Sequence, residues 1–320
     1  MKKNIAVVAG GSSSEYVISL KSAGLIMSCI DSERFNPYLV IMEKSQWYVK
    51  LDGTSYPINR ANFSWEKEGQ TIHFDQIYNI IHGTPGEDGK IQGYFDLLGI
   101  PYTGCDVLTS AITFNKNICK QLVRSHSITT PQSVVLRQHQ PYSVDELTKE
   151  LQFPCFVKPN NGGSSFGASK VDQSTGLADA ITKGFEHDHE VLIEEYILGT
   201  ELTCGVYWDG DMARALPITE IVTKNAFFDF QAKYEGASEE ITPARVDEET
   251  TQKCQKLTER IYTLLGCRGL ARLDFILRAG ELYFIEANTT PGCSPESIIP
   301  QQIRAAGLNI KEIVNGQLIV

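Results

Sequence analysis

Two apolar runs between residues 270 and 288 constrain this chain more than any other segment. The runs Leu270 to Leu277 and Glu281 to Ala287 are rich in Leu, Ile, Phe and Tyr, and Arg278-Ala279-Gly280 separates them. Two such runs joined by a short glycine-containing turn predict a β-hairpin. In that hairpin Asp274 and Glu286 can be cross-strand neighbours.

The polar residues of this hairpin have the chemistry of a magnesium site. Alternate residues of a strand share a face, so Glu286 and Asn288 project together, and Asp274 adds a second carboxylate. Mg²⁺ binds one or two carboxylates, keeps several waters and takes substrate phosphates as further ligands, so the cluster predicts a nucleotide beside it. The alternative is a hairpin whose charges face solvent, but Asn288 and the nearby Arg272 favour the metal site.

A glycine- and serine-rich segment is a candidate phosphate-binding loop. The apolar run Pro154 to Pro159 contains Lys158 and is followed by Asn160 to Gly167 and a short strand, Ala168 to Val171. Glycines let backbone N–H groups wrap an anion, and the lysine adds a positive charge. The segment is not a Walker A loop, because the nearest match, Gly86 to Lys90, is followed by isoleucine. Alone it could be a flexible connection, but together with the metal cluster it favours ATP.

Six motifs occur together in the order found in one protein family. They are Gly10-Gly11-x-Ser13-x-Glu15; His82-Gly83-x-x-Gly86-Glu87-Asp88-Gly89; Lys158-Pro159 with Gly163-Ser164-Ser165-x-Gly167; Asp229-x-x-x-Lys233-Tyr234; Arg272-x-Asp274; and Glu286-x-Asn288-x-x-Pro291-Gly292-x-x-x-x-Ser297. In this order and rough spacing the motifs resemble those of the D-alanine:D-alanine ligases, which are ATP-grasp enzymes. The resemblance extends from Asn4 to about Ile310. Any one motif is weak, but six in register are very specific.

The resemblance implies an α/β fold with a three-domain ATP-grasp architecture. Residues 1–115 would form a parallel-sheet N-terminal substrate domain, and residues 116–200 a small central α+β domain. Residues 201–320 would form a larger C-terminal α+β domain that carries catalysis and the metal.

Local patterns give an alternation of strands and helices that suits this division. Strands are expected at Ile5 to Ala9, Tyr38 to Met42, Ile77 to Ile81, Val191 to Tyr196, 202–208 and 213–221, and helices at Glu15 to Cys29, Ile91 to Leu98, around Leu177 to Phe185, and at 247–265. Ser14 is expected to cap the first helix, and Ser143-x-x-Glu146 is a capping box. Gly99 and Gly266 are expected to end the helices before them.

By resemblance, the chain ligates two D-alanines to D-alanyl-D-alanine through a D-alanyl phosphate, with ATP consumed, for peptidoglycan precursor synthesis. The attacking carboxylate and the triphosphate are both anions, so charge neutralisation and positioning matter most. The resemblance implies two Mg²⁺ ions, for which Mn²⁺ can substitute: Glu286 bridges them, Asp274 binds one and Asn288 the other. Arg272 would stabilise the developing oxyanion.

The resemblance also assigns the other site residues. Glu15 would bind the ammonium of the first D-alanine, His82 would line that subsite, and Ser297 would hold the carboxylate of the second D-alanine. The full substrate set is Glu15, His82, Arg272, Gly292 and Ser297; the ATP set is Lys116, Lys158, Gly163, Ser164, Ser165, Glu194, Glu195, Ile197, Glu201 and Lys233; and the catalytic set is Glu15, Ser164, Lys233, Tyr234 and Arg272. Taken singly, Glu15 could be a first-turn helix acid, His82 a hydrogen-bonded loop residue and Lys116 a solvated charge.

The polar segment Thr223 to Pro243 is expected to act as a lid, because it is long, carries Lys233 and Tyr234, and has no periodic pattern. Tyr234 would join Glu15 and Ser164 in one hydrogen-bonded set.

Three positions depart from the family pattern. Glu195 stands where many members carry lysine, and an acid cannot donate to a purine ring nitrogen, which puts nucleotide affinity in question. Phe228 replaces a frequent tyrosine. Cys293 replaces a larger apolar residue, and the change can widen the pocket near Ser297.

Composition agrees with this interpretation. With 320 residues, 42% of them hydrophobic, the chain can bury a large core in two or three domains. A net charge of -10 argues against a nucleic-acid or anionic-membrane partner. The scattered cysteines are expected to be reduced thiols. With no signal-peptide core or membrane-length apolar run, a cytoplasmic protein is expected, and the resemblance implies a homodimer.

Several alternatives stay open. The first is a D-alanine:D-lactate or D-alanine:D-serine ligase, although lactate-using relatives lack the pair present here as Lys233-Tyr234. A biotin-dependent carboxylase-type ATP-grasp subunit would lack the opening Gly-Gly-x-Ser-x-Glu motif. A non-catalytic nucleotide-binding module would have lost metal ligands or Arg272. A Rossmann dehydrogenase, suggested by Ala9-Gly10-Gly11, would need G-x-G-x-x-G, which the sequence lacks.

Overall fold

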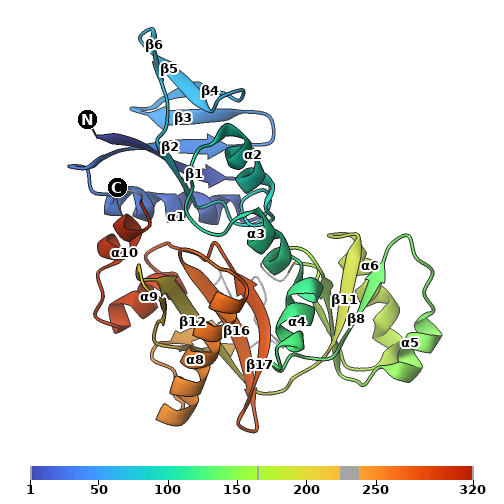
Figure 1. The fold of residues 1–320 in the computed structure, drawn as a ribbon. Helices are drawn as coiled ribbons and strands as arrows, with labels where there is room; N and C mark the ends of the chain where they lie inside the picture. Colours follow the sequence, from blue (N-terminus) through green and yellow to red (C-terminus); the bar gives the residue numbers. More distant parts are fainter. Residues whose placement is uncertain (1, 164–165, 224–237, 319–320) are drawn as a thin grey trace.

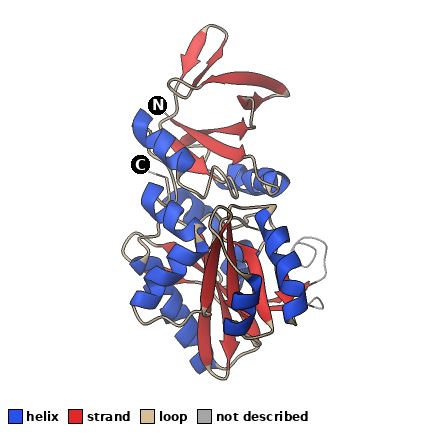
Figure 2. Ribbon diagram, turned by 90° about the vertical axis from the view of Figure 1, so that its right-hand side faces the viewer, coloured by secondary structure: helices blue, strands red, loops and turns tan. Residues whose placement is uncertain are grey.

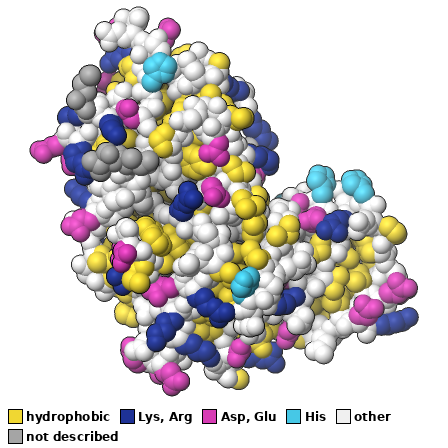
Figure 3. All heavy atoms as spheres, viewed as in Figure 1, with side chains coloured by type: hydrophobic (Ala, Val, Ile, Leu, Met, Phe, Trp, Pro, Cys, Tyr) yellow, Lys and Arg dark blue, Asp and Glu magenta, His cyan; other side chains and the backbone are white. Residues whose placement is uncertain are grey.

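The computed structural model describes residues 2–163, 166–223 and 238–318, which form three β-sheets with helices packed around them. Figure 1 shows the first sheet at the top, the second at the right and the third at the bottom. With all atoms drawn, the lobe around the second sheet stands apart from the main body, with a notch between it and the first sheet's domain (Figure 3). The predicted mixed α/β class is confirmed.

The first sheet combines parallel and antiparallel strands. Its order is β6-β5-β4-β3-β2-β1-β7, with β1 Lys3–Gly10, β2 Phe35–Met42, β3 Trp47–Leu51, β4 Thr54–Asn59, β5 Ser64–Lys67, β6 Gln70–Ile72 and β7 Gln76–Asn79. Strand β1 pairs in parallel with β2 and β7, as predicted, and is buried from Ile5 onward. Strands β3 to β6 extend the sheet as antiparallel strands that were not predicted.

Three hairpins close through two-residue turns in which both residues have positive φ. The pairs are Asp52-Gly53 (48° and 79°), Glu68-Gly69 (51° and 76°) and Ala279-Gly280 (51° and 79°). Turns with this geometry match the right-handed twist of the strands that they join, and Asp-Gly is among their strongest sequence signals. Asp52-Gly53 therefore carried a signal for the missed pair β3–β4.

Two helices accompany the first sheet, α1 Tyr16–Cys29 and α2 Lys90–Leu98. The next helix, α3 Val107–Phe114, packs against α4 (Lys116–Ser125) and against β17 (Glu281–Asn288) of the third sheet. Gly99 ends α2 with a φ of 66°, as predicted. The prediction that Ser14 caps α1 is wrong. The residue at the cap is Glu15, whose side chain makes no capping bond, and its backbone N–H donates to Ser13 Oγ at 3.2 Å.

The second sheet is small and antiparallel. Its order is β10-β9-β11-β8, with β8 Ser133–Arg137, β9 Cys155–Pro159, β10 Ser169–Val171 and β11 Glu190–Glu195. Helices α5 Val144–Glu150 and α6 Leu177–Phe185 and the 3₁₀ turn η1 Ser174–Gly176 accompany it, and apolar residues of both helices share its core. Ser143 caps α5 by accepting a hydrogen bond from the backbone N–H of Glu146, as the capping box predicted.

The third sheet holds the predicted hairpin. Its order is β15-β14-β12-β16-β17, with β13 paired to β12; the strands are β12 Thr200–Trp208, β13 Ala213–Ala215, β14 Thr219–Thr223, β15 Ser238–Ile241, β16 Ala271–Arg278 and β17 Glu281–Asn288. The single strand expected over 213–221 is two strands, because Pro217 between them has no N–H to donate to a ladder. The helices around this sheet are α4 Lys116–Ser125, α8 Glu248–Leu264 and α9 Ile298–Ala305, whereas α10 Ile310–Gly316 packs against α1 and α9. Gly266, with a φ of 70°, follows α8 as predicted.

The last described residues belong to the core of the first sheet. Ile313 of α10 and Leu318 lie in one buried cluster with Ile5 of β1, and Asn315 donates a hydrogen bond to the carbonyl of Cys29 at 2.9 Å. Both ribbon views place the two chain ends close together (Figures 1 and 2). The first domain is therefore completed by residues far away in the sequence.

All eight cysteines are buried and unpaired, as expected for reduced thiols. Among the helices described, none is long and apolar enough to cross a bilayer.

Candidate active site

One large cleft, of about 1370 Å³, lies where the three sheets meet. Its walls come from the loops after β1 and β7, from the second sheet and from the third sheet; they include Ser12 to Glu15, Gly83, Lys116, Phe156, Lys158, Gly162, Gly163, Glu194 to Leu198, Glu201, Glu220, Asp274 and Glu286. A second cavity, of about 30 Å³, also includes Glu15, Lys116 and Gly163 in its lining, together with Glu286 and Asn288. Predicted substrate, phosphate and metal residues thus share one region.

The hairpin β16–β17 brings the predicted metal ligands together. Asp274 lies opposite Glu286, and Arg272 opposite Asn288, with a register shift directly after Asp274. The Asp274 carboxylate accepts bonds from Arg272 Nε and Nη2 and from Asn288 Nδ2, all at 3.0 Å. Thr203 Oγ1, on the neighbouring strand β12, donates to Asp274 Oδ1 at 2.6 Å. The sequence prediction did not include Thr203.

Glu286 pairs with the lysine that begins helix α4. Lys116 Nζ lies 3.4 Å from Glu286 Oε2 and donates to the carbonyl of Gly162 in the candidate phosphate loop. Asn115 caps this helix by accepting from Ile118 N at 3.0 Å, which fixes where Lys116 leaves the backbone. Each metal-site carboxylate therefore has a protein cation beside it.

These donors fit Mg²⁺. Two carboxylates and an amide on adjoining strands are the hard oxygen ligands that Mg²⁺ prefers. Within the described residues no group of three or more His, Cys, Asp or Glu side chains could hold a metal. The amide of Asn288, waters and a bound phosphate would therefore have to complete the coordination.

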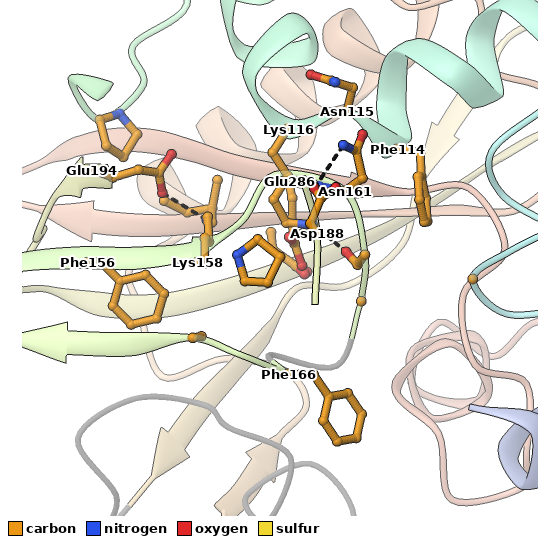
Figure 4. A pocket seen from close by; sticks show the side chains of 18 of the residues that line it. Phe114, Asn115, Lys116, Phe156, Lys158, Asn161, Phe166, Asp188, Glu194 and Glu286 are labelled. Atoms are coloured by element: carbon orange, nitrogen blue, oxygen red, sulfur yellow. Dashed lines mark hydrogen bonds and ion pairs between the residues drawn. The ribbon is translucent and has the colours of Figure 1, made fainter. Parts of the chain in front are cut away.

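A buried carboxylate between two lysines lies on the second sheet. Glu194 accepts bonds from Lys120 through Oε1 and from Lys158, 2.8 Å away, through Oε2 (Figure 4 shows the Lys158 pair). All three residues are buried. Lys158, predicted from sequence as a phosphate-binding cation, is thus bound to Glu194, whose side chain would read the edge of the nucleotide base by the sequence resemblance. Lys120 was missed, although its spacing of four from Lys116 places the two on one helix face.

The phosphate loop is anchored by two acids at the start of β11. Asn160 Nδ2 donates to Glu190 Oε2 at 2.6 Å, and the backbone and side chain of Asn161 donate to Asp188 Oδ2 at 2.7 and 2.9 Å. Figure 4 shows Asn161 turned toward Asp188. The start of the loop is therefore fixed in place.

His82 is a buried connector between the first domain and the loop after β17. Its Nδ1 lies 2.7 Å from the carbonyl of Thr290, which can only accept, so Nδ1 carries the proton. Its Nε2 then accepts from Ser22 Oγ at 3.0 Å, and Ser22 in turn accepts from the backbone N–H of Cys293. Burial lowers the pKa of His82, which favours this neutral form. His82 is not among the residues that line the two cavities.

Glu87, which the sequence prediction gave no role, makes a parallel connection. Its Oε2 accepts from Gly83 N at 2.7 Å and its Oε1 from Thr290 N at 3.0 Å. Burial, reinforced by the nearby Glu15 carboxylate, raises the pKa of Glu87 to about 7. The signal in the sequence that could have identified Glu87 was its position in the motif that begins at His82.

Gly292 and Ser297 lie side by side but outside the lining of the two cavities. A Cβ atom on Gly292 would be 3.1 Å from Ser297 Oγ, which accepts from Ser294 N at 3.0 Å. Cys293 is buried in the core beneath the first sheet and lines neither cavity, so the expected widening of the pocket is not seen.

Glu195, Ile197 and Glu201, which the resemblance assigns to ATP, all line the large cleft. Glu195 pairs with Arg278 Nη1 at 3.3 Å, and its backbone N–H donates to Gln132 O at 2.9 Å. The acid at this departure from the family therefore has a cationic partner from the third sheet.

Five predicted positions lie outside the described residues: Ser164, Ser165, Phe228, Lys233 and Tyr234. Most of the predicted lid, Thr223 to Pro243, lies outside them as well.

Comparisons with known proteins extend over the whole chain. Residues 4–105 match the family model for the D-ala D-ala ligase N-terminus, and residues 122–319 match that for the D-ala D-ala ligase C-terminus. A D-alanine--D-alanine ligase from Phocaeicola vulgatus is 51% identical over 316 residues, covering 98% of both chains, and one from Bacteroides fragilis is 49% identical over the same length.

Solved structures agree. The VanG D-Ala:D-Ser ligase from Enterococcus faecalis aligns with a TM-score of 0.89 at 33% identity, covering 99% of this chain and 98% of that one. D-alanyl-alanine synthetase A from Vibrio cholerae also gives 0.89, at 29% identity, covering 99% and 97%.

Proposed function

The chain belongs to the D-alanine:D-alanine ligase family, and we propose that it joins two D-alanines to D-alanyl-D-alanine with conversion of ATP to ADP and phosphate. The product supplies peptidoglycan precursor synthesis. The fold is that of the ATP-grasp enzymes.

The observation that carries this proposal is the distribution of charge along the cleft. Glu194 with Lys158 lies on the second sheet, Asp274 with Arg272 lies on the third, and Glu286 of the third sheet pairs with Lys116 of α4. A nucleotide along this wall would place its base near Glu194 and its phosphates near Lys116. The cations that now pair with these carboxylates would then pair with the phosphates.

In the first step, a D-alanine carboxylate oxygen attacks the γ-phosphorus, and ADP leaves as the acyl phosphate forms. Both reactants are anionic, so Lys116 and the backbone N–H groups around Gly163 would neutralise and position the phosphate. In the second step, the amine of another D-alanine attacks the acyl carbon and phosphate leaves. Arg272, next to Asp274, would stabilise the oxyanion of that tetrahedral species.

We further propose that two Mg²⁺ ions, or Mn²⁺ in their place, bind at Asp274, Glu286 and Asn288. When bound, they would neutralise phosphate charge and orient the transferred group. The support is the cross-strand placement of two carboxylates and an amide in the lining of the neighbouring cavities.

The substrate subsites are assigned from the sequence resemblance. Glu15 would bind the first D-alanine ammonium, since its carboxylate faces Gly163 across the loop; His82 and Glu87 would hold the walls of that subsite together. Gly292 and Ser297 would receive the carboxylate of the second D-alanine. Ser164, Ser165, Lys233 and Tyr234 keep their proposed phosphate and catalytic roles from the sequence resemblance.

Three further proposals concern the whole molecule. The division at 115/116 and 200/201 into three domains and a homodimer are what the resemblance implies, and a cytoplasmic location is what the sequence pattern leads us to expect. The exposed Leu97 of α2 and Leu108 of α3 are candidate contact residues between protomers. Light scattering after size exclusion would test the dimer.

The test of the proposed function is a single assay with ATP and Mg²⁺ against D-alanine, L-alanine, D-lactate and D-serine, with phosphate measured and the product identified by mass. D-alanyl-D-alanine is the expected product. The likeness to a D-Ala:D-Ser ligase makes D-alanyl-D-serine the second candidate. Mainly D-alanyl-D-lactate at pH 7 and equal substrate concentrations would contradict the proposal.

A further inference from the structure

Each oxygen of the Glu194 carboxylate has its own lysine. Lys158 reaches Oε2 from β9, in the same sheet, and Lys120 reaches Oε1 from α4. Glu194 and Lys158 line the cleft, whereas Lys120 is 1% exposed and does not. Lys120 can therefore act on a ligand only through the residue that it holds.

The three charges depend on one another. Burial lowers the pKa of Lys120 to about 7, while the Glu194 carboxylate acts in the opposite direction. Burial would raise the pKa of Glu194, but the two lysines outweigh it and lower that pKa. Without one of these lysines, the ionised form of the buried Glu194 would be less stable and its carboxylate would be less fixed in orientation.

We propose that Lys120 is a positioning residue for base recognition, which holds the Glu194 carboxylate in the orientation that accepts a hydrogen bond from the exocyclic amine of adenine. The inference rests on the proposed use of ATP. With one lysine on each oxygen, every oxygen keeps a further lone pair for a ligand donor. Guanine presents a carbonyl oxygen at the corresponding position, so two acceptors would face each other with no proton between them. A site built to bond a donor rejects a ligand that lacks it.

Helix α4 gives this arrangement its rigidity. Lys116 and Lys120 are four residues apart, which is about 6 Å along the helix axis. One reaches Glu286 at the metal end of the cleft and the other reaches Glu194 at the base end. The helix ties the base-reading carboxylate to the rest of the cleft, so its orientation does not depend on the second sheet alone.

The test is Lys120→Met, which removes the ammonium and keeps an unbranched chain of similar length. Affinities for ADP and GDP are measured by calorimetry, and kcat/KM is measured with ATP and GTP. We expect ADP affinity to fall about tenfold or more, GDP affinity to change less, and the ATP:GTP preference to fall about tenfold, with the KM for D-alanine within about twofold. Lys183→Met, an exposed lysine of the same domain that donates to the carbonyl of Ala168, is the matched control and should leave both nucleotides unaffected.

If Lys120 has only a structural role, Lys120→Met should lower the melting temperature but leave the ADP:GDP affinity ratio and the ATP:GTP ratio of kcat/KM at the wild-type value. That result would show the proposal to be wrong. Where Lys120→Met does not fold, the pair Glu194→Gln and Lys120→Met/Glu194→Gln replaces it, because a neutral amide does not need the ammonium. Equal ratios in those two variants support action through Glu194, whereas a further loss in the double variant contradicts it. Binding of ADP without ligation by the wild-type chain would overturn the proposed function and leave this inference testable.

Discussion

The backbone of Gly163 meets the carboxylate of Glu15 so closely that a side chain has no room between them. A Cβ atom on Gly163 would lie 2.8 Å from Glu15 Oε2. A larger residue at position 163 would therefore displace the Glu15 carboxylate from its place beside the phosphate loop.

Gly163→Ala should lower kcat/KM for D-alanine about 100-fold, because either the loop or Glu15 must move away. Steady-state kinetics measures the loss, and far-UV circular dichroism should be unchanged. Gly24→Ala is the control, since an added methyl group there meets nothing within 4 Å. It sits inside α1, so it should raise the stability by up to about 1 kcal/mol and leave activity intact. Full activity in Gly163→Ala would show that the close approach has no functional role.

Glu286→Gln should abolish dipeptide synthesis with the fold intact, because the site loses one of two carboxylates and Lys116 loses its ion-pair partner. The expected loss exceeds 100-fold, measured as dipeptide formed per minute. Glu281→Gln tests the same change on the same strand, at an exposed residue that bonds Thr129, and should be neutral. Activity within about tenfold of wild type, about 1.4 kcal/mol of barrier, would remove Glu286 from the proposed metal site.

Thr203→Val should raise the Mg²⁺ concentration needed for half-maximal activity several-fold, while the KM for D-alanine changes little. Its hydroxyl donates to Asp274 Oδ1 at 2.6 Å, and second-layer bonds of this kind orient metal ligands. The control is Thr219→Val in β14 of the same sheet, whose hydroxyl bonds Thr242 and Gln302 of α9. If both variants show the same Mg²⁺ dependence, the Thr203 bond does not orient a metal ligand.

Glu87 should make the folded state less stable as the pH rises from about 4.5 to 7. Its pKa is about 7 in the folded chain against an ordinary 4.5, so in this range the folded state keeps a proton that the unfolded state releases. The loss reaches roughly 3 kcal/mol by pH 7 and then stays level. Thermal unfolding of the wild type and of Glu87→Gln across pH 4 to 8 measures it. The variant should lack this component of the slope; parallel curves would mean that Glu87 does not titrate in this range.

The hairpin that carries the candidate metal ligands was predicted from the sequence more completely than the strands of the first sheet. The pairing of Asp274 with Glu286 followed from local signals alone, namely two apolar runs and a glycine turn, and the structure confirms it. Strands β3 to β6 were missed because they are short and have several exposed positions, so they show neither a long apolar run nor a helical period.

The contacts that the sequence could not give are those between distant segments. Lys120 lies in a helix that is polar overall, and its burial depends on Glu194, which is 74 residues away. Thr203 is recognisable as a partner of Asp274 only after β12 is known to lie beside β16. Local patterns place a residue on an element, but the sheet order decides which elements meet.

The packing of residues 310–318 against β1 and α1 also affects how the chain is made. Ribosomes deliver the first sheet early, yet Ile5 and its neighbours lack part of their apolar cover until Ile313 and Leu318 emerge some 300 residues later. During that interval the nascent first domain exposes apolar surface, which promotes chaperone binding or premature association. Ribosome-stalled chains ending before residue 310 should therefore bind a hydrophobic dye that full-length chains do not.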